Sequence, residues 1–163
     1  SSSSRGLGDV YKRQLLLKTD GQGNEQWRKT FGEGDGSSVQ QTVDGGFIVT
    51  GRDGDYDVFL FKTDGSGNEQ WRRTYGDGDG TMVHQTVDGG FILSGYVGDL
   101  DYEQILLLKT DSQGNQQWRK NFGGGAGWSV RQTVDGGFIV TGMDGDNDNS
   151  QICLLYTLTL PTT

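Results

Sequence analysis

The sequence is poor in the residues that most enzymes use for chemistry. It has 163 residues but only one cysteine, one proline and one histidine. One histidine, His84, and one cysteine near the end of the chain do not assemble a Ser–His–Asp or Cys–His arrangement. No apolar run approaches the 18 residues of a membrane-spanning helix. Lys and Arg number 14 against 22 Asp and Glu, a net charge of −8, which argues against nucleic acid and anionic membrane surfaces as partners.

Glycine is the residue in excess. There are 29 glycines, and they fall at recurring places between short apolar runs, while hydrophobic residues make up only 31% of the chain. This is the composition of a β protein with many tight turns.

Both ends depart from the pattern of the rest of the chain. Residues 1–14 contain DVYKRQ and residues 153–163 begin with CLLYT. DVYKRQ looks like the translation of one strand of a sequencing adaptor, and CLLYT looks like the translation of the complementary strand. We therefore expect residues 15–152 to be the native part, a fragment of a longer protein, and give no role to Cys153 or Pro161.

Residues 15–152 contain an internal repeat. Trp27, Trp71 and Trp118 are spaced by 44 and 47 residues. One stretch of eleven residues occurs three times in nearly the same form: QTVDGGFIVTG at Gln41–Gly51, QTVDGGFILSG at Gln85–Gly95 and QTVDGGFIVTG at Gln132–Gly142. A period in the mid-forties is typical of β-propeller blades.

One period contains four candidate strands. They are rich in β-branched and aromatic residues and are separated by Asp/Gly/Asn turns: Gly46–Gly51, Asp57–Asp64, Glu69–Tyr75 and Thr81–Val87. Glycine interrupts every run, which excludes a helical solenoid. The sequence therefore predicts an all-β fold, a partial β-propeller of about three four-stranded antiparallel blades. The ring is incomplete, since propellers use about four to eight blades.

The repeat resembles a known family. Its order is W-x-x-x-[FY]-G-x-G, then QTVDGG-F-I-[VL]-[TS]-G, then an apolar strand ending in KTD-x-x-GN-x-x-W. This is similar to the repeats of secreted bacterial and archaeal β-propellers, and more loosely to pyrroloquinoline-quinone-type propeller repeats. The resemblance covers nearly all of residues 15–152 and implies an extracellular or cell-surface location.

The repeat predicts how neighbouring blades meet. We expect the eleven-residue stretch to be the outermost strand of one blade turning into the innermost strand of the next. The aromatic residues that recur in each copy are expected to form the core between blades: Trp27, Trp71, Trp118, Phe47, Phe91 and Phe138. Burial of one such tryptophan contributes about 4–6 kcal/mol to the free energy of folding, before the opposing loss of conformational entropy is counted.

Carboxylates are the one reactive group in excess. Eight aspartates alternate with other residues in the loops between the first and second strands, and are the candidate ligands for Ca²⁺: Asp53, Asp55, Asp57, Asp99, Asp101, Asp144, Asp146 and Asp148. A second acidic set, Glu33, Asp35, Asp77 and Asp79, lies between the third and fourth strands. In an up-and-down blade both loop families leave from the same end of the strands, so we expect one acidic face.

Three roles are open for this acidic face. The acids can simply solvate the loops. They can bind Ca²⁺, because DGDNDN resembles the start of an EF-hand loop, although Asn149 stands where that loop has glycine. They can act as paired carboxylates in acid–base catalysis of glycoside hydrolysis. Repetition in each blade argues against catalysis, since a catalytic pair is normally unique.

Together these observations predict a non-enzymatic binding or structural scaffold. Its expected partners are a protein or an extracellular glycan, met through the acidic face, together with further blades of the same propeller. No membrane insertion and no cofactor other than Ca²⁺ are expected. The alternatives are a calcium-binding propeller module and part of a glycan-active or quinone-dependent enzyme.

Calcium binding is tested by thermal unfolding. If the aspartates bind Ca²⁺, the melting temperature rises in millimolar Ca²⁺ relative to a chelator, because a ligand of the folded state stabilises it. An unchanged melting temperature in a protein with a closed ring would exclude a calcium site.

Overall fold

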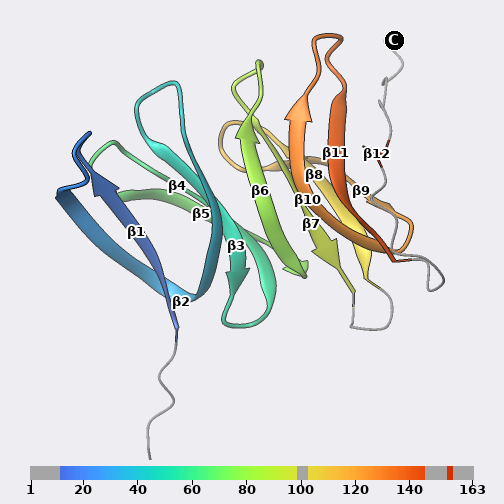
Figure 1. Cartoon of the computed structure of the whole chain (residues 1–163), viewed down its shortest axis with the longest axis horizontal. Coiled ribbons are helices and arrows are strands. Elements are labelled where there is room, and N and C mark those ends of the chain that lie inside the picture. The colour runs from blue at the N-terminus through green and yellow to red at the C-terminus, as the bar shows by residue number, and fades with distance from the viewer. Residues whose placement is uncertain (1–11, 99–102, 146–153, 156–163) are drawn as a thin grey trace, which may run out of the picture.

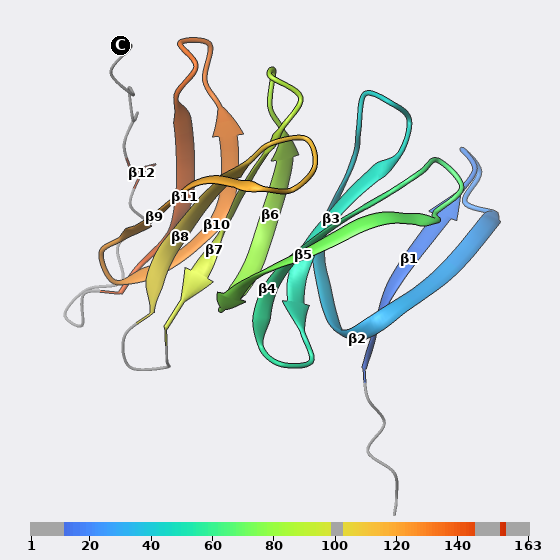
Figure 2. The ribbon, with the colours of Figure 1, turned by 180° about the vertical axis from the view of Figure 1, so that it is seen from behind.

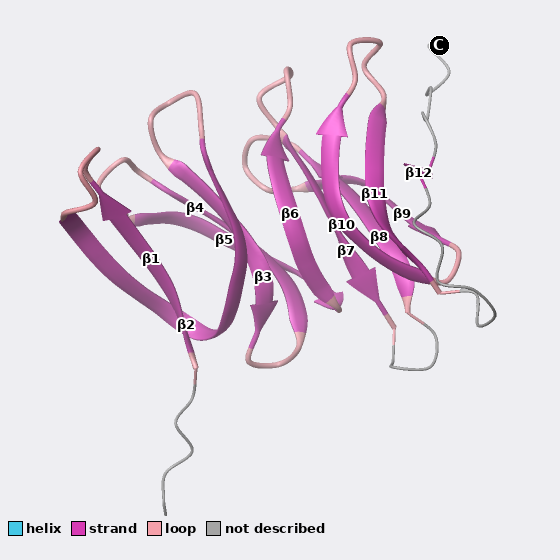
Figure 3. Ribbon diagram, in the orientation of Figure 1, coloured by secondary structure: helices cyan, strands magenta, loops and turns pink. Residues whose placement is uncertain are grey.

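The computed structural model describes residues 12–98, 103–145 and 154–155, and the described residues are strands and loops. The strands form three antiparallel sheets that stand side by side in a fan (Figures 1 and 3). The prediction of an all-β fold is confirmed. The sheets are open at both ends of the stack within the described residues. None of these residues belongs to a helix that could cross a bilayer.

The sheets differ in strand number. The first has five strands: β1 (Arg13–Thr19), β2 (Glu25–Gln41), β3 (Phe47–Asp53), β4 (Asp57–Thr63) and β5 (Glu69–Asp77). The second has four: β6 (Asp79–Gln85), β7 (Phe91–Val97), β8 (Gln104–Thr110) and β9 (Gln116–Phe122). The third has three: β10 (Gly125–Gln132), β11 (Phe138–Asp144) and β12 (Leu154–Leu155). Strands β1 and β12 include residues of the two end segments that the sequence analysis set aside.

The chain passes between sheets at a glycine. Gly78 lies between β5 and β6 with φ 137°, and a Cβ atom there would lie 2.4 Å from the carbonyl oxygen of Tyr96. Its N–H donates to the carbonyl of Tyr56 at 2.9 Å. Gly34 and Gly125 make the equivalent bonds in the other repeats. At Gly34 the strand does not break, so the long β2 pairs with β1 through its first half and with β3 through its second.

The prediction that the eleven-residue repeat joins two blades is wrong. Strand β2 pairs with β3, β6 with β7 and β10 with β11, so each copy of QTVDGGFIVTG is a hairpin inside one sheet. The strand predicted as the last of a blade is therefore the first strand of its sheet. The crossing occurs one strand earlier, in the GDGDG stretch, because its glycines permit backbone that turns away from the sheet. Asp/Gly-rich hairpins and crossings look alike in sequence.

The hairpin needs both of its glycines. Gly45 has φ 82°, a conformation that other residues rarely adopt. Gly46 lies so close to β4 that a Cβ atom would come within 2.1 Å of the Thr63 carbonyl oxygen. The side chain of Asp44 closes the turn by accepting from the hydroxyl of Thr42 at 2.5 Å and from the N–H of Gly46 at 3.1 Å.

A buried lysine fixes each of the first two hairpins to the middle of its sheet. Lys62 on β4 is almost fully buried, and its ammonium group lies 2.6 Å from Asp44 and 2.9 Å from the side-chain oxygen of Gln70. In the second sheet Lys109 makes the same contacts with Asp88 and Gln117. This explains why TVDGG and the KTD sequence recur together. A buried ammonium group requires both a carboxylate and further acceptors.

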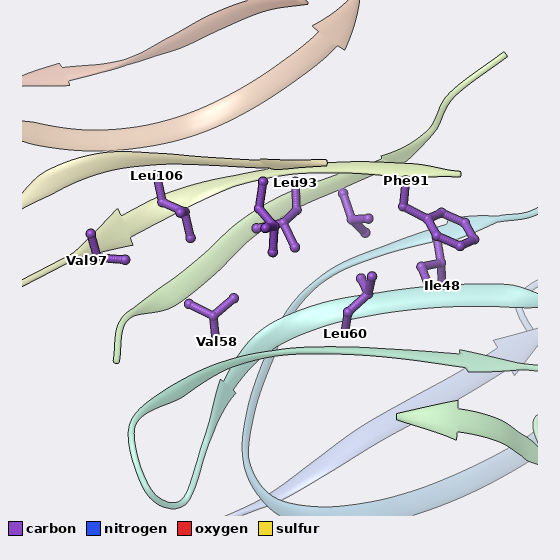
Figure 4. Close-up of a cluster of buried hydrophobic side chains, with 9 residues drawn as sticks. Ile48, Val58, Leu60, Phe91, Leu93, Val97 and Leu106 are labelled. Carbon is purple, nitrogen blue, oxygen red and sulfur yellow. The ribbon is translucent and has the colours of Figure 1, made fainter. Parts of the chain in front are cut away.

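Apolar residues fill the spaces between sheets. The second sheet is buried on both faces. Leu106 and Leu108 pack toward Ile48, Val58 and Leu60 of the first sheet (Figure 4). Ile105 and Leu107 of the same strand pack toward the third sheet. A strand with neighbours on both faces reads as a continuous apolar run, which is why QILLLKT does not alternate.

The same aromatic pair occurs once in each repeat. Trp71 packs on Phe91 and Trp118 on Phe138 across the two joints between consecutive sheets, with ring centroids 5.9 and 5.6 Å apart. Trp27 of β2 and Phe47 of β3 make the same pair, at 5.8 Å, inside the first sheet, where β2 passes from β1 to β3. The three tryptophans are half-buried.

The lysine–aspartate pair predicts an asymmetric mutational effect. Asp44→Asn leaves the buried ammonium group of Lys62 without its carboxylate, and we expect the free energy of unfolding to fall by about 2–3 kcal/mol. Lys62→Met keeps the packing of the stem and leaves a solvated carboxylate, so its loss is expected to be about 1 kcal/mol or less. Urea unfolding measures both, with Asp55→Asn in an exposed loop as control. Equal losses for the two variants would contradict this account.

The same pairs predict acid sensitivity. The hydrogen bond from Lys62 lowers the pKa of Asp44 to about 2. Burial alone would raise the pKa of Asp88, but hydrogen bonds from Thr86 and Lys109 outweigh it and lower the pKa to about 2. Because the pKa of each carboxyl is lower in the folded state, its ionised form stabilises the fold at pH values above the ordinary pKa of 3.8. This stabilisation is lost as the pH falls toward 2.

Both carboxylates are half-exposed, so we expect the loss to be about 1 kcal/mol for each of them. In the double variant Asp44→Asn/Asp88→Asn, stability measured between pH 5 and pH 2 should depend less on pH by this amount. An unchanged pH profile would show that the two pairs do not carry the effect.

Candidate functional site

The two ends of the sheets differ in their loops. The TVDGG hairpins project from one end, the upper edge in Figure 1, together with the short β4–β5 turn. The loop that joins β3 to β4 leaves from the opposite end, where the crossing at Gly78 also lies, as the bond from Gly78 to Tyr56 shows. Figure 2 shows the same arrangement from behind. The acidic β3–β4 loop and the acidic crossing at Gly78 thus share one end of the stack, which we call the acidic end.

The predicted calcium ligands are only partly described. Asp53, Asp55 and Asp57 lie at the β3–β4 loop, and Asp144 ends β11. The other four lie outside the described residues: Asp99, Asp101, Asp146 and Asp148. Within the described ranges no three His, Cys, Asp or Glu residues are grouped so that they could hold a metal ion.

The described aspartates shape their own loop. One oxygen of Asp53 accepts from the backbone N–H groups of Asp55 and Asp57, at 3.0 and 2.9 Å. Desolvation, followed by the charges of Asp53, Asp77 and Asp55, raises the pKa of Asp57. The β3–β4 loop and the end of β5, where Asp77 lies, are therefore close enough for their carboxylates to repel one another.

A cleft opens at the acidic end between the first and second sheets. Its volume is about 830 Å³, within the range of small-molecule sites. The lining residues come from both sheets: Arg52, Tyr56, Asp77 and Gly78 from the first, and Tyr96, Val97, Gly98, Glu103 and Arg119 from the second.

Tyr56 is held in an unfavourable backbone conformation at this cleft. Its φ is 67°, and it is the non-glycine residue with positive φ among the described residues. Its N–H donates to the carbonyl of Asp53 at 3.1 Å, and its own carbonyl accepts from Gly78 at 2.9 Å. The side chain is nevertheless exposed. A bulky residue in this region costs about 1–2 kcal/mol, and such strain is often found at binding sites.

Charged groups of both signs surround the tyrosines. The guanidinium of Arg52 lies 5.0 Å from the centre of the Tyr56 ring and 3.8 Å from a carboxylate oxygen of Asp35. The hydroxyl of Tyr96 donates to Asp79 at 3.4 Å, and burial raises the pKa of Asp79.

Arg119 crosses the joint between the sheets. It lies on β9 of the second sheet and donates to the carbonyl of Tyr75 on β5 at 2.6 Å. Asp77 and Glu103 add carboxylates to the same cleft. The lining therefore offers both hydrogen-bond donors and acceptors.

Sequence reasoning identified the acidic end but missed the cleft. It did not single out Arg52, Tyr56, Tyr96 or Arg119 as binding residues. The signal was present as a departure from the repeat, because Arg52, Tyr96 and Met143 occupy one position in three otherwise similar strands. A position that varies while its neighbours repeat indicates a local role. His84, by contrast, lies half-buried on β6, and burial lowers its pKa.

Comparison with known proteins adds no assignment. No protein-family model matches the chain. No curated protein matches it either.

Proposed function

We propose that the chain is part of an extracellular or cell-surface β-propeller that acts as a non-enzymatic scaffold and binds a neutral glycan in the cleft at its acidic end. The propeller assignment is supported by the period of the repeat, the antiparallel order of β6 to β9, and the Trp–Phe pair that recurs in each repeat. The location rests on the family resemblance of the repeat.

The observation that carries the binding function is the strained, exposed Tyr56 at the cleft. A residue that costs stability in a loop of otherwise favourable turn residues indicates a role outside folding. Tyr56 and Tyr96 supply flat apolar surfaces with polar edges, which suit a ligand that is both apolar and hydroxylated. Sugar rings have this character.

The charges around the cleft favour a neutral ligand. An anionic ligand would meet Asp77 and Glu103, and a cationic one would meet Arg52 and Arg119. Hydroxyl groups donate to carboxylates and accept from guanidinium groups, so they can satisfy both kinds of side chain. A neutral oligosaccharide is therefore the chemical class that fits.

Asp79 favours a second function, glycoside hydrolysis. Burial raises its pKa, as expected of a general acid, and it lies next to the cleft through its bond to Tyr96. This candidate is distinguished by the release of reducing ends from a bound oligosaccharide, which a scaffold does not catalyse.

Binding is tested by calorimetry with cello-, chito- and manno-oligosaccharides, and with oligogalacturonate and chitosan oligomers as charged counterparts. We expect a neutral member to bind and Tyr56→Gly to weaken its binding about tenfold, since the ring is lost. The same variant removes the backbone strain, so its free energy of unfolding should rise by up to about 1 kcal/mol.

A matched pair of variants controls for charge. Arg52→Met introduces the residue that the third repeat carries at this position and should weaken binding, because a donor is lost. Lys120→Met also replaces a cationic side chain by methionine, on an exposed residue outside the cleft, and should leave binding unchanged. The proposal would be overturned if the two variants had equal effects on binding. It would also be overturned if only the charged oligomers bound, or if no oligomer bound at all.

A further inference from the structure

The three most exposed large hydrophobic residues that the structure describes occupy equivalent positions. They are Val43, Val87 and Val134, each at the tip of a TVDGG hairpin, and they are 91%, 92% and 111% exposed. The three hairpins project side by side from the upper edge of the stack in Figure 1, at the end opposite the cleft. We call these three residues the valine row.

The exposure of the valine row does not depend on where the stack of sheets ends. Val87 belongs to the second sheet, which packs against a sheet on either side, and it is as exposed as Val43. The fold does not require valine here either. Val43 is the second residue of a tight turn, a position that accepts most residues and favours proline, whereas β-branched residues favour strands. An apolar side chain exposed at the same place in three sheets indicates contact with another molecule.

Hydrogen bonds hold the hairpin tips in a fixed row. The side-chain oxygen of Gln85 accepts from the N–H of Val43 in the preceding sheet at 2.9 Å, and its amide nitrogen donates to the carbonyl of Gly89 in its own hairpin at 3.3 Å. Gln132 accepts from the N–H of Val87 at 3.0 Å in the same way. Each joint between two sheets thus has one glutamine that connects neighbouring tips. Because these bonds already order the tips, the row loses little conformational entropy when a partner binds.

The residues next to the valine row are acidic. Each valine is followed by an aspartate, and the side chains of Asp44 and Asp88 are 55% and 54% exposed. The lysines that pair with them are 8% and 5% exposed, so a partner meets the carboxylates and not the ammonium groups. The hydrogen bond from Thr133 lowers the pKa of Asp135, so the third carboxylate is ionised at neutral pH as well. The row therefore combines apolar side chains with negative charge.

The N–H groups at the tips are already bonded. In the first hairpin the N–H of Val43 donates to Gln85 and that of Gly45 to the carbonyl of Thr42, and the second hairpin makes the same two bonds. An extended peptide, which binds through backbone hydrogen bonds, would therefore gain little here. A helix bonds its own backbone and presents side chains alone. Helical residues seven apart lie about 10.5 Å apart on nearly one face, which matches the ~10 Å spacing of packed sheets.

We propose that the valine row binds a cationic amphipathic helix of another protein. Apolar side chains of the helix pack on the three valines, and lysine or arginine residues beside them pair with the carboxylates. This contact involves neither the cleft nor its ligand, since the cleft lies at the opposite end of the strands. Because part of the attraction is ionic, added salt should weaken the binding without abolishing it.

The test is the fluorescence anisotropy of a labelled synthetic helical peptide titrated with the purified full chain. The peptide carries leucine at every seventh position, lysine three and four residues after each leucine, and alanine elsewhere. We expect it to bind. A peptide of the same composition with its leucines distributed around the helix should bind at least about tenfold more weakly, because its leucines cannot reach the row together. A peptide with glutamate in place of lysine should also bind at least about tenfold more weakly, because its charge repels the carboxylates.

Variants of the chain provide a matched test. The triple variant Val43→Ser/Val87→Ser/Val134→Ser removes the row and should weaken binding of the first peptide at least about tenfold, and Val87→Ser alone about threefold. Val39→Ser makes the same change on an exposed side chain of β2 away from the tips, and should leave binding unchanged. Circular dichroism reports whether each variant folds.

The proposal is overturned if the first peptide does not bind, or if it binds no more tightly than either control peptide. It is also overturned if a folded triple variant binds the first peptide as tightly as the unmodified chain does. The comparison of the three peptides uses the unmodified chain, so it decides the question even where a variant does not fold.

Discussion

Burial of apolar side chains between neighbouring sheets is the constraint on which the structure depends. One such sheet is too thin to cover its own apolar side chains. Leu106, Leu107 and Leu108 are consecutive and all buried, which is possible only because a sheet lies on either side of β8. The same three-leucine run in β1 has a neighbour on one side, and there Leu16 alone is buried. The same three-leucine sequence thus has different surroundings in β8 and in β1, because the two strands have different positions in the stack.

The contacts at one end of the strands are repeated, whereas the loops at the other end vary. At the hairpin end, Asp44 and Lys62 hold the turn to the sheet, and nearly the same residues return in the next repeat. At the acidic end the loops differ from repeat to repeat, and one of them holds Tyr56 in strained backbone. A rigid end of repeated contacts can support an end whose loops vary, which is the usual division between scaffold and binding site. The proposed glycan site lies on the variable end.

The all-β fold and the strands could be predicted from sequence because period, turn chemistry and apolar alternation all agree. The grouping of strands into sheets could not. Hairpins and crossings are both rich in Asp and Gly, and only backbone conformation distinguishes the hairpin at Gly45 from the crossing at Gly78. The cleft escaped prediction for a related reason. It forms where residues from two sheets meet, and Arg52, Tyr96 and Arg119 come together only once the sheets are stacked.

The uniformity of the joints has a consequence for how such a protein can change in length. Each joint between two sheets uses one tryptophan, one phenylalanine, one crossing glycine and the same arrangement of apolar strands, and the aromatic pair and the glycine recur where β2 passes from β1 to β3. Recombination between two copies of the repeat would add or remove one period and leave every surviving joint chemically intact. Gene duplication can therefore vary the number of sheets without compensating substitutions, while the loops at the acidic end diversify independently.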